Sequence, residues 1–271
     1  MMEILVLGSG TSHGVPMIGC DCEVCRSSNP RNRRFRPSIL VRHEGKAILV
    51  DTTPELRLQS LTFDVRQVDA VLFTHTHADH IFGLDDLRRF NDLMDREIPV
   101  YGDAATLDDI RRIYPYIFKE TQVGGGKPRL TLHPIETEFD LFGLRIRSFY
   151  VMHGRLPVLS YRFDAPATAA EPAYSVAYVT DVNYIPPDAR ACLQNLDMLF
   201  LDAVRFEPHA THFGLYQALE VIADLQPRQG AYLTHLSHHF EHEAVNAQLP
   251  PNVALAYDGL TVRCGERIDK R

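Results

Sequence analysis

The chain has 271 residues, 45% of them hydrophobic, so it can bury a substantial core, arranged as one large domain or two small ones. A formal net charge of −7 argues against a surface that holds a long nucleic acid through many phosphate contacts. No stretch approaches the roughly 20 consecutive apolar residues that cross a bilayer, and the first residues lack the pattern of an export signal. The five cysteines are an odd, unevenly placed set, which fits a reducing compartment, so we expect a cytoplasmic protein without membrane contact.

Short apolar or alternating runs recur along the chain and predict β-strands. Two of the turns between them, Glu44-Gly45 and Phe142-Gly143, are typical of hairpins, so the predicted sheets are not purely parallel. The predicted strands are, in chain order, residues 3–7, 39–41, 47–50, 68–73, 144–151, 176–179, 198–201, 231–233 and 253–256.

Apolar residues at helical spacing predict helices between these strands, with Asp79 and Thr106 as amino-terminal caps. The order of the elements is mixed α and β. No repeat or linker divides the chain, so we expect a single domain over residues 1–271. The predicted helices are residues 79–93, 106–118, 187–193, 214–225 and 241–248, and the predicted irregular segments are about 9–37, 123–128 and 164–172.

A dense cluster of metal-binding side chains directly follows the apolar run at residues 68–74. It comprises His75, His77, Asp79 and His80. Imidazole nitrogen and carboxylate oxygen suit zinc and neighbouring divalent ions, and four such groups in six residues exceed what one tetrahedral ion accepts from so short a segment. The alternative is a chance cluster in a chain with 13 histidines. The cluster favours a site for two metal ions.

A two-metal site needs further ligands from distant parts of the chain, and three polar residues stand where apolar strands end. His153 follows the run that begins at Leu144, Asp181 follows the run 176–179, and His235 follows the run 231–233. A buried imidazole or carboxylate at such a place is costly unless it is hydrogen-bonded or bound to metal. Each residue alone could be an ordinary strand-end side chain, but together with the cluster they indicate one site.

The pattern His-x-His-x-Asp-His resembles the signature of the metallo-β-lactamase superfamily, and the resemblance spans nearly the whole chain. It implies the α/β (α+β) four-layer αβ/βα sandwich of two mixed β-sheets flanked by helices. By position, it implies that one metal is bound by His75, His77 and His153, the second by Asp79, His80 and His235, and that Asp181 bridges them. The best-known lactamases of this superfamily have Cys at the bridging position, so hydrolysis of β-lactams is not expected.

Three thiols lie in the long irregular segment after the first strand, at Cys20, Cys22 and Cys25. A closed tetrahedral zinc site needs a fourth ligand, and His238, three residues beyond His235, is the candidate. The alternatives are inert reduced thiols or part of an iron–sulfur site. We expect a structural zinc ion that stabilises the segment against the edge of the active site.

The cysteine loop combined with His-x-x-His near the end of the chain resembles the PhnP-type phosphodiesterases, which act on cyclic phosphate diesters. The loop also resembles a superfamily protein of pyrroloquinoline quinone biosynthesis, whose catalytic motif is degraded, whereas every ligand is intact here. The resemblance implies a metal-dependent hydrolase, with two divalent ions (zinc or manganese) whose hydroxide cleaves a small cyclic or activated phosphodiester.

The same resemblance places the general acid that protonates the leaving group at His212, with His209 as a competitor close by in the sequence. Asp79 and Asp181 complete the expected catalytic set. Three alternative functions stay open: an endonuclease that processes transfer-RNA 3′ ends, a thioester hydrolase like glyoxalase II, and a non-catalytic metal-binding protein like the quinone-biosynthesis relative. We expect a small phosphodiester substrate and no long nucleic acid partner, and the resemblance makes a homodimer reasonable.

Overall fold

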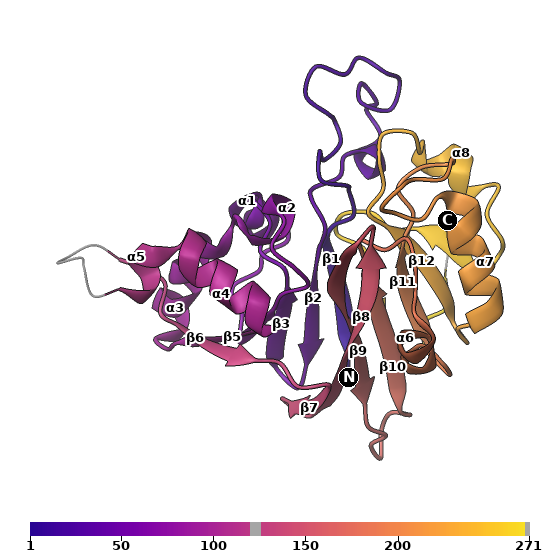
Figure 1. The fold of residues 1–271 in the computed structure, drawn as a ribbon. Helices are drawn as coiled ribbons and strands as arrows, with labels where there is room; N and C mark the ends of the chain where they lie inside the picture. Colours follow the sequence, from indigo (N-terminus) through magenta and orange to yellow (C-terminus); the bar gives the residue numbers. More distant parts are fainter. Residues whose placement is uncertain (120–125, 269–271) are drawn as a thin grey trace.

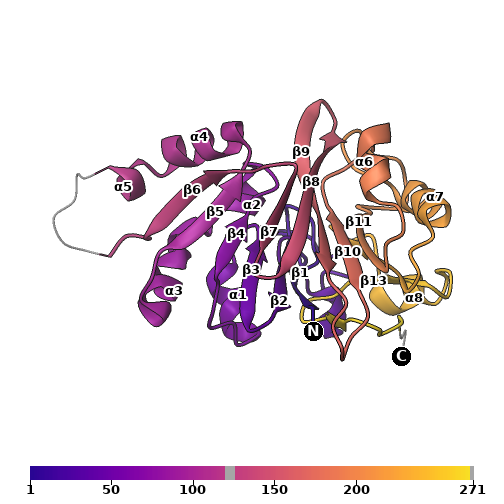
Figure 2. The same cartoon turned by 90° about the horizontal axis from the view of Figure 1, so that it is seen from below.

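The computed structural model describes residues 1–119 and 126–268. Two mixed β-sheets pack face to face, and helices cover both outer faces, which confirms the predicted αβ/βα sandwich (Figures 1 and 2). In order, the strands of the first sheet are β14 (Thr261–Arg263), β1 (Glu3–Gly8), β2 (Ser38–His43), β3 (Lys46–Val50), β4 (Ala70–Leu72), β5 (Ile98–Gly102) and β6 (Leu130–Pro134). Those of the second are β13 (Val253–Leu255), β12 (Gly230–Thr234), β11 (Met198–Asp202), β10 (Tyr174–Val179), β9 (Leu156–Ala165), β8 (Leu144–His153) and β7 (Glu138–Leu141).

Each sheet has its own layer of helices. The outer face of the first sheet packs against α1 (Leu56–Thr62), α2 (Ala78–Ile81), α3 (Leu87–Met94), α4 (Ala104–Ile113) and α5 (Pro115–Phe118). The second sheet carries α6 (Pro187–Cys192), α7 (Leu215–Leu225) and α8 (His242–Asn246). Of the helices that the structure describes, none has the length and apolar composition needed to cross a bilayer.

The central strands are apolar on both faces because both faces are buried. In β1, Ile4 and Val6 point into the core between the sheets, while Leu5 and Leu7 lie under the helices of the first sheet. The core between the sheets also contains large aromatic side chains from the second sheet, among them Tyr161 and Phe200. A strand in this position shows an unbroken hydrophobic run, which is why the sequence reveals the central strands best.

Both predicted hairpin turns are confirmed. Glu44-Gly45 joins β2 to β3 and Phe142-Gly143 joins β7 to β8, and all four residues have positive φ angles, as a type I′ turn requires.

The predicted helix at 79–93 is wrong as a single element. The chain forms α2, a 3₁₀ turn (Leu84–Asp86) and then α3, and the break falls at Gly83. A Cβ atom at Gly83 would lie 2.0 Å from the carbonyl oxygen of Thr53, so the backbone of the preceding loop approaches too closely for any other residue. Asp79 lies inside α2 and is not its cap; His77 occupies that position.

Other differences have similarly local causes. The helix predicted at 106–118 begins at Ala104, because Asp103 is the cap and accepts a hydrogen bond from the amide of Thr106, and it is interrupted before Pro115. The strands β5, β6, β7, β9 and β14 and helix α1 were not predicted. Part of the predicted loop at 123–128 lies outside the described residues, and the loop predicted at 164–172 begins only after β9 ends at Ala165.

Candidate metal centres

The candidate catalytic site lies where parallel strands end. Within the first sheet β3 runs parallel to β4, and within the second sheet β10, β11 and β12 run parallel, so their carboxyl ends meet at one edge of each sheet. Polar side chains follow these ends: Asp51 after β3, His75 after β4, Asp181 after β10, Asp202 at the end of β11 and His235 after β12. All are buried, and the face-to-face packing of the sheets brings them together.

The first group of candidate ligands comprises Asp79, His80, Asp181 and His235, whose ligand atoms all lie within 4.8 Å of one another. His80 Nε2 lies 3.3 Å from a carboxylate oxygen of Asp79 and 3.2 Å from one of Asp181, and His235 Nε2 lies 3.5 Å from the other oxygen of Asp181. Short segments from three parts of the chain thus surround one point.

The remaining predicted ligands surround the other side of Asp181. The ring centroids of His75 and His77 are 4.5 Å apart, and those of His77 and His153 are 5.2 Å apart. His153 and Asp181 also belong to one group of ligand atoms within 4.8 Å. The structure therefore brings all seven predicted side chains together, with Asp181 between the two groups.

The chemistry of these side chains fits bound divalent cations. The Nε2 atoms of His75, His80 and His235 are buried and make no hydrogen bond to any residue in the described ranges. Leaving a buried polar atom unpaired costs about 1–3 kcal/mol, and two bound metal ions, one at His75 and one at His80 and His235, would satisfy these nitrogens. The carboxylates of Asp79 and Asp181 outweigh the effect of burial and raise the pKa of His80 well above its usual value, so the site calls for positive charge.

Three of these residues have a backbone conformation that is uncommon for side chains other than glycine. The φ angles are +63° at Asp51, +55° at Asp181 and +60° at His235, each just after a buried strand. The left-handed region costs roughly 1–2 kcal/mol per residue, and such strain clusters at functional sites. The left-handed backbone conformation turns the chain sharply at the end of each strand.

Asp51 was not predicted as a site residue, and its carboxylate contacts the candidate ligand His80. One carboxylate oxygen lies 2.7 Å from His80 Nδ1, and the carboxylate accepts hydrogen bonds of 2.8 Å from the amide and the hydroxyl of Thr74. The contact holds the His80 ring so that its Nε2 faces the other ligands. Asp51 follows the apolar run 47–50, the same pattern that identified Asp181 and His235.

Asp202 was not predicted as a site residue either, although it ends an apolar strand. Its side chain positions His212. Its carboxylate lies 2.7 Å from His212 Nδ1 and accepts a 2.9 Å hydrogen bond from the amide of Val182. Burial raises the pKa of Asp202 to about 8 and lowers the pKa of His212. The imidazole ring of His212 stacks on that of His235 at a centroid distance of 4.6 Å.

The structure distinguishes His212 from His209, the other candidate for the general acid. His212 is buried, and its ring lies 4.5 Å from that of His153, so it borders the candidate ligands on two sides. His209 is half-buried, lies 5.2 Å from His212, and has its Nδ1 near the hydroxyl of Thr211. The ring of His212 therefore lies between that of His209 and the candidate ligands.

A second, separate centre joins the three predicted thiols to His238. The Nδ1 atom of His238 lies 3.2 Å from the sulfur of Cys20, 3.3 Å from that of Cys22 and 3.8 Å from that of Cys25. The amide of Cys25 and then His238 lower the pKa of Cys22 to about 6, which favours the thiolate that binds metal. Three sulfurs and one imidazole fit a closed tetrahedral zinc site.

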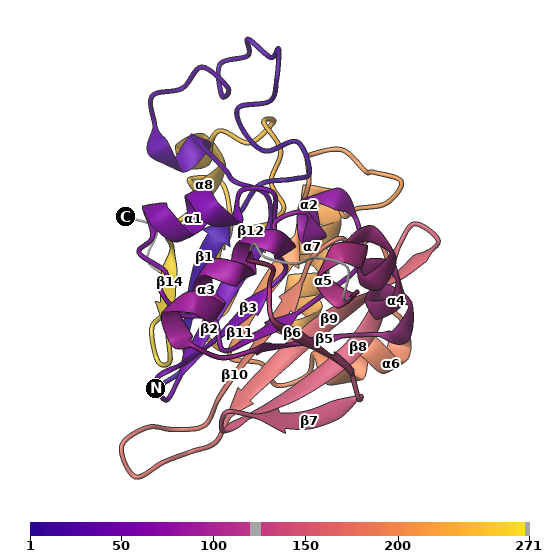
Figure 3. The same ribbon diagram turned by 90° about the vertical axis from the view of Figure 1, so that its left-hand side faces the viewer.

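The segment that carries these thiols projects beyond the carboxyl ends of the strands, beside α8 (Figures 1 and 3). Arg34 is buried and donates hydrogen bonds of 2.9 Å to the carbonyl of Ser237 and 2.8 Å to that of Phe240. Arg36 forms an ion pair with Glu55. These arginines therefore hold the segment in place and are not free to bind a phosphate.

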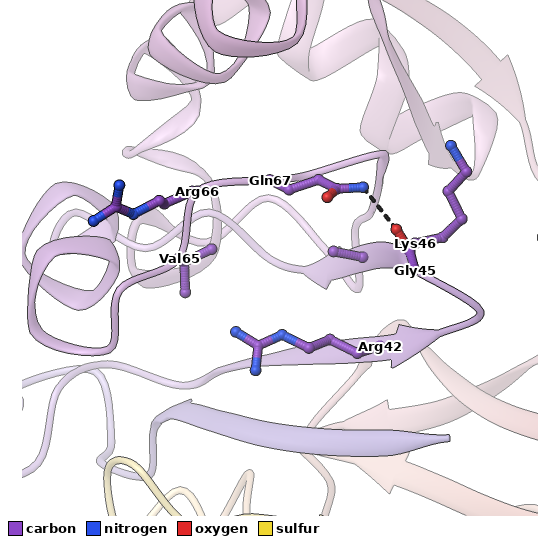
Figure 4. Close-up of a pocket in the computed structure, with 7 residues that line it drawn as sticks. Arg42, Gly45, Lys46, Val65, Arg66 and Gln67 are labelled. Atoms are coloured by element: carbon purple, nitrogen blue, oxygen red, sulfur yellow. Dashed lines mark hydrogen bonds between the residues drawn. The ribbon is translucent and has the colours of Figure 1, made fainter. Parts of the chain in front are cut away.

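A cavity of about 280 Å³ between β2, β3 and the chain before β4 is basic in composition (Figure 4). Each of its cations already has a carboxylate partner, because Arg42 pairs with Glu3, Lys46 with Asp69 and Arg66 with Asp64. It lies at the start of β3, whereas the candidate ligands gather at the end of that strand. It is not part of the candidate site.

Comparison with known proteins supports this description. The family model described as β-lactamase superfamily domain matches residues 46–236. A crystal structure of a new diphosphatase from the PhnP family is 39% identical, covers 96% of each chain and superposes with a TM-score of 0.86.

Among the curated relatives, a protein named octanoyltransferase from Porphyromonas gingivalis is 36% identical over 98% of this chain and 52% of its own length. A ribonuclease Z from Methanopyrus kandleri is 28% identical over 59% of this chain and 53% of its own length. The chain therefore spans about half the length of the curated relatives that it matches.

Proposed function

Because the chain belongs to the metallo-β-lactamase superfamily, we propose that it is a metal-dependent phosphodiesterase that acts on small cyclic or activated phosphodiesters. The observation that carries this proposal is the His212–Asp202 pair at the edge of the seven candidate ligands. A phosphodiester needs both charge neutralisation at phosphorus and a proton for the departing oxygen, and the two groups of residues match these needs.

In this proposal one ion would be held by His75, His77 and His153 and the other by Asp79, His80 and His235, and Asp181, which belongs to both groups of ligand atoms, would contribute to both. Two bound divalent ions, zinc or manganese, would lower the pKa of water and neutralise the phosphoryl oxygens. A structural zinc ion held by the thiols and His238 stabilises the segment beside the site.

The chain itself supplies the proton. Asp202 fixes Nδ1 of His212, which leaves Nε2 to donate to the leaving oxygen. Overall, one water adds across the phosphorus–oxygen bond: its oxygen bonds to phosphorus and keeps one proton, His212 gives a proton to the leaving oxygen, and the other proton of the water restores that of His212. Asp202 is a positioning residue, since it acts only through His212.

We also propose that the protein works in the cytoplasm, as a homodimer, on a small substrate and not on a long nucleic acid. The charge of −7 supports the last point, because a long polyanion would be repelled.

A substrate panel on metal-reconstituted protein tests the proposal. It comprises bis(p-nitrophenyl) phosphate, 2′,3′-cyclic nucleotides, a ribose cyclic phosphate, a precursor transfer RNA, an octanoyl thioester and a chromogenic cephalosporin. We expect turnover of the small phosphodiesters. Cleavage restricted to the thioester, the transfer RNA or the cephalosporin would overturn the proposal.

Thioester hydrolysis is the second candidate, because the relative named octanoyltransferase matches 98% of this chain. That match covers only 52% of the relative, so the acyl transfer of its name can belong to either half. The thioester arm of the panel separates the two functions. Transfer-RNA processing is the function favoured by the ribonuclease Z relatives. Cleavage of the precursor transfer RNA in the panel distinguishes it from the other two functions.

A further inference from the structure

The three thiols of the cysteine segment form a cluster that the solvent reaches. Cys20, Cys22 and Cys25 are each partly exposed, and their sulfur atoms belong to one group of ligand atoms within 4.8 Å of one another. Asp21 and Glu23, on either side of Cys22, are exposed, and the segment projects beyond the strand ends (Figures 1 and 3). A small oxidant can therefore reach these sulfurs, which is the first requirement for a reactive thiol.

Within the cluster, Cys22 and Cys25 are the pair best placed to form a disulfide. The amide of Arg26 donates a 3.0 Å hydrogen bond to the carbonyl of Cys22, which closes a helical turn and brings residues 22 and 25 to the same side of it. The amide of Cys25 donates a 3.4 Å hydrogen bond to the sulfur of Cys22 and so stabilises the Cys22 thiolate. A Cys-x-x-Cys pair whose first thiolate is stabilised in this way is typical of thiol–disulfide exchange.

The outer part of the cysteine segment has almost no apolar core of its own. Within residues 16–31, all of which the structure describes, Val24 is the only buried residue, and Ile18 is 96% exposed. Fixing the backbone costs about 1–2 kcal/mol per residue, and little apolar burial offsets that cost here. The bonds of a bound zinc ion to the thiols would supply the missing stability. Loss of those bonds should therefore release this part of the segment.

The cluster is connected to the candidate catalytic site through its fourth member, His238. The ligand His235 stands three residues earlier, and the residue after it, Leu236, is paired with the start of the cysteine segment. The amide of Leu236 donates a 2.8 Å hydrogen bond to the carbonyl of Ser9, and its carbonyl accepts one of 3.1 Å from the amide of Thr11. A change in the bonding of His238 therefore acts on a stretch of chain that carries a catalytic ligand.

We propose that Cys22 and Cys25 are a reversible oxidation site, which regulates the candidate catalytic site by releasing the structural zinc ion and loosening the segment. The inference rests on the proposed function and adds its regulation. Hydrogen peroxide is the oxidant. The Cys22 thiolate attacks one peroxide oxygen, the oxygen–oxygen bond breaks, hydroxide leaves, and a sulfenic acid remains on Cys22. The Cys25 thiolate then attacks the Cys22 sulfur, the disulfide forms, and a second hydroxide leaves. The two sulfurs together lose the two electrons that the peroxide gains, and a dithiol reverses the reaction.

Treatment of the metal-reconstituted protein with hydrogen peroxide tests the inference. Mass spectrometry of alkylated peptides follows each cysteine, a zinc-sensitive dye follows the released ion, and limited proteolysis follows the segment at residues 9–37. We expect a disulfide between Cys22 and Cys25, release of zinc and faster cleavage of the segment, all reversed by dithiothreitol with added zinc. Cys192 and Cys264 are also partly exposed and serve as internal controls, which should react at least about tenfold more slowly. Oxidation of Cys22 no faster than theirs, or zinc that stays bound, would overturn the inference.

The oxidised protein should turn over bis(p-nitrophenyl) phosphate about tenfold more slowly or worse, because a small displacement of a catalytic ligand can cost up to about 10²-fold. Unchanged turnover after complete disulfide formation would show that the site does not regulate catalysis and would sink the inference.

The Cys25→His variant keeps four zinc-binding side chains but removes the second thiol of the pair. It should retain its zinc at about tenfold more peroxide than the parent protein, whereas Cys192→Ser should respond as the parent does. A zinc-loaded Cys25→His protein as sensitive as the parent would contradict the pair, and if this variant binds no zinc, the peptide map of the parent protein still decides. No phosphodiester turnover before peroxide is added would sink the proposed function, and the disulfide, zinc and proteolysis measurements would then decide the oxidation site independently.

Discussion

At the scale of single residues, the candidate catalytic site depends on side chains that are buried and only partly satisfied by the protein. His235 has neither ring nitrogen in a hydrogen bond to a described residue, and a carboxylate oxygen of Asp202 is likewise without one. A fold selected for stability alone would avoid such atoms, because each costs about 1–3 kcal/mol. Their concentration at the strand ends is the local signature of a functional centre.

The first prediction concerns the proton donor. His212→Ala should leave the metal content unchanged, because His212 is not one of the seven candidate ligands. It should lower kcat on a 2′,3′-cyclic nucleotide by roughly 10²- to 10⁴-fold, the usual contribution of general acid catalysis. The loss should be much smaller on bis(p-nitrophenyl) phosphate, whose leaving group departs without help. Unchanged turnover of the cyclic nucleotide would remove His212 from the mechanism.

The second prediction concerns Asp51, which contacts His80 and is not one of the seven candidate ligands. Asp51→Asn keeps the shape but replaces one acceptor oxygen with a donor beside His80 Nδ1, so the ring loses its preferred orientation. We expect the affinity for the second catalytic metal to fall by about 10- to 100-fold, measured by competition with a chelator. The count of zinc at the cysteine centre serves as the internal control, and an unaltered affinity would show that Asp51 is not a positioning residue.

At the scale of elements, helix α2, which carries the last two residues of the histidine cluster, is short because the loop after β3 approaches it. The amide of Thr52 donates a 2.7 Å hydrogen bond to the carbonyl of His80, and the amide of Gly83 donates a 2.9 Å bond to the carbonyl of Thr52. These contacts bind the loop that carries Asp51 to the helix that carries Asp79 and His80. The broken helix is thus part of how the ligands are positioned.

The third prediction follows from this approach. Gly83→Ala would place a Cβ atom 2.0 Å from the carbonyl oxygen of Thr53, so the free energy of unfolding should fall by about 1–3 kcal/mol, measured by urea denaturation. Gly126→Ala is the matched control, because a Cβ atom there meets nothing within 4 Å. Equal stability of the two variants would contradict the role given to Gly83.

At the scale of the whole molecule, one short segment connects the two metal centres. His235 belongs to the catalytic group and His238 to the thiol group, and Leu236 between them pairs with Gly10 of the cysteine segment. Arg34 ties that segment to the same stretch through Ser237 and Phe240. A metal ion bound at the cysteine centre would therefore stabilise one wall of the candidate catalytic site as well as its own loop.

The fourth prediction tests this connection. Cys22→Ser should lower the metal content by one ion per chain, measured by elemental analysis, and lower Tm by at least about 5 °C, because structural zinc contributes folding energy. Cys192→Ser should change neither quantity by much, since Cys192 lies on α6 and belongs to no ligand group. The same ion count in Cys22→Ser and the parent protein would refute the structural zinc.

The sequence was most informative where burial leaves a clear pattern. Central strands such as β1 and β10 are apolar on both faces, and polar residues directly after them stand out. Edge and exposed strands such as β6 and β7 are half polar, so they were missed. Asp51 and Asp202 follow the same rule as Asp181, but a lone carboxylate after a strand resembles many ordinary turns until its partners are known.

By itself the sequence determined the mixed α and β order, the set of candidate ligands and the separate thiol group, because these depend on residue type and on spacing along the chain. The sandwich fold was implied by the resemblance of the His-x-His-x-Asp-His pattern to the metallo-β-lactamase superfamily. Only the tertiary structure decided that the carboxylate of Asp51 contacts His80 and that of Asp202 contacts His212. It also decided that Gly83 breaks the helix and that Arg34 joins the cysteine segment to the stretch after β12. The physical reason is that these contacts join segments far apart in the chain, and their distances are set by how the two sheets pack.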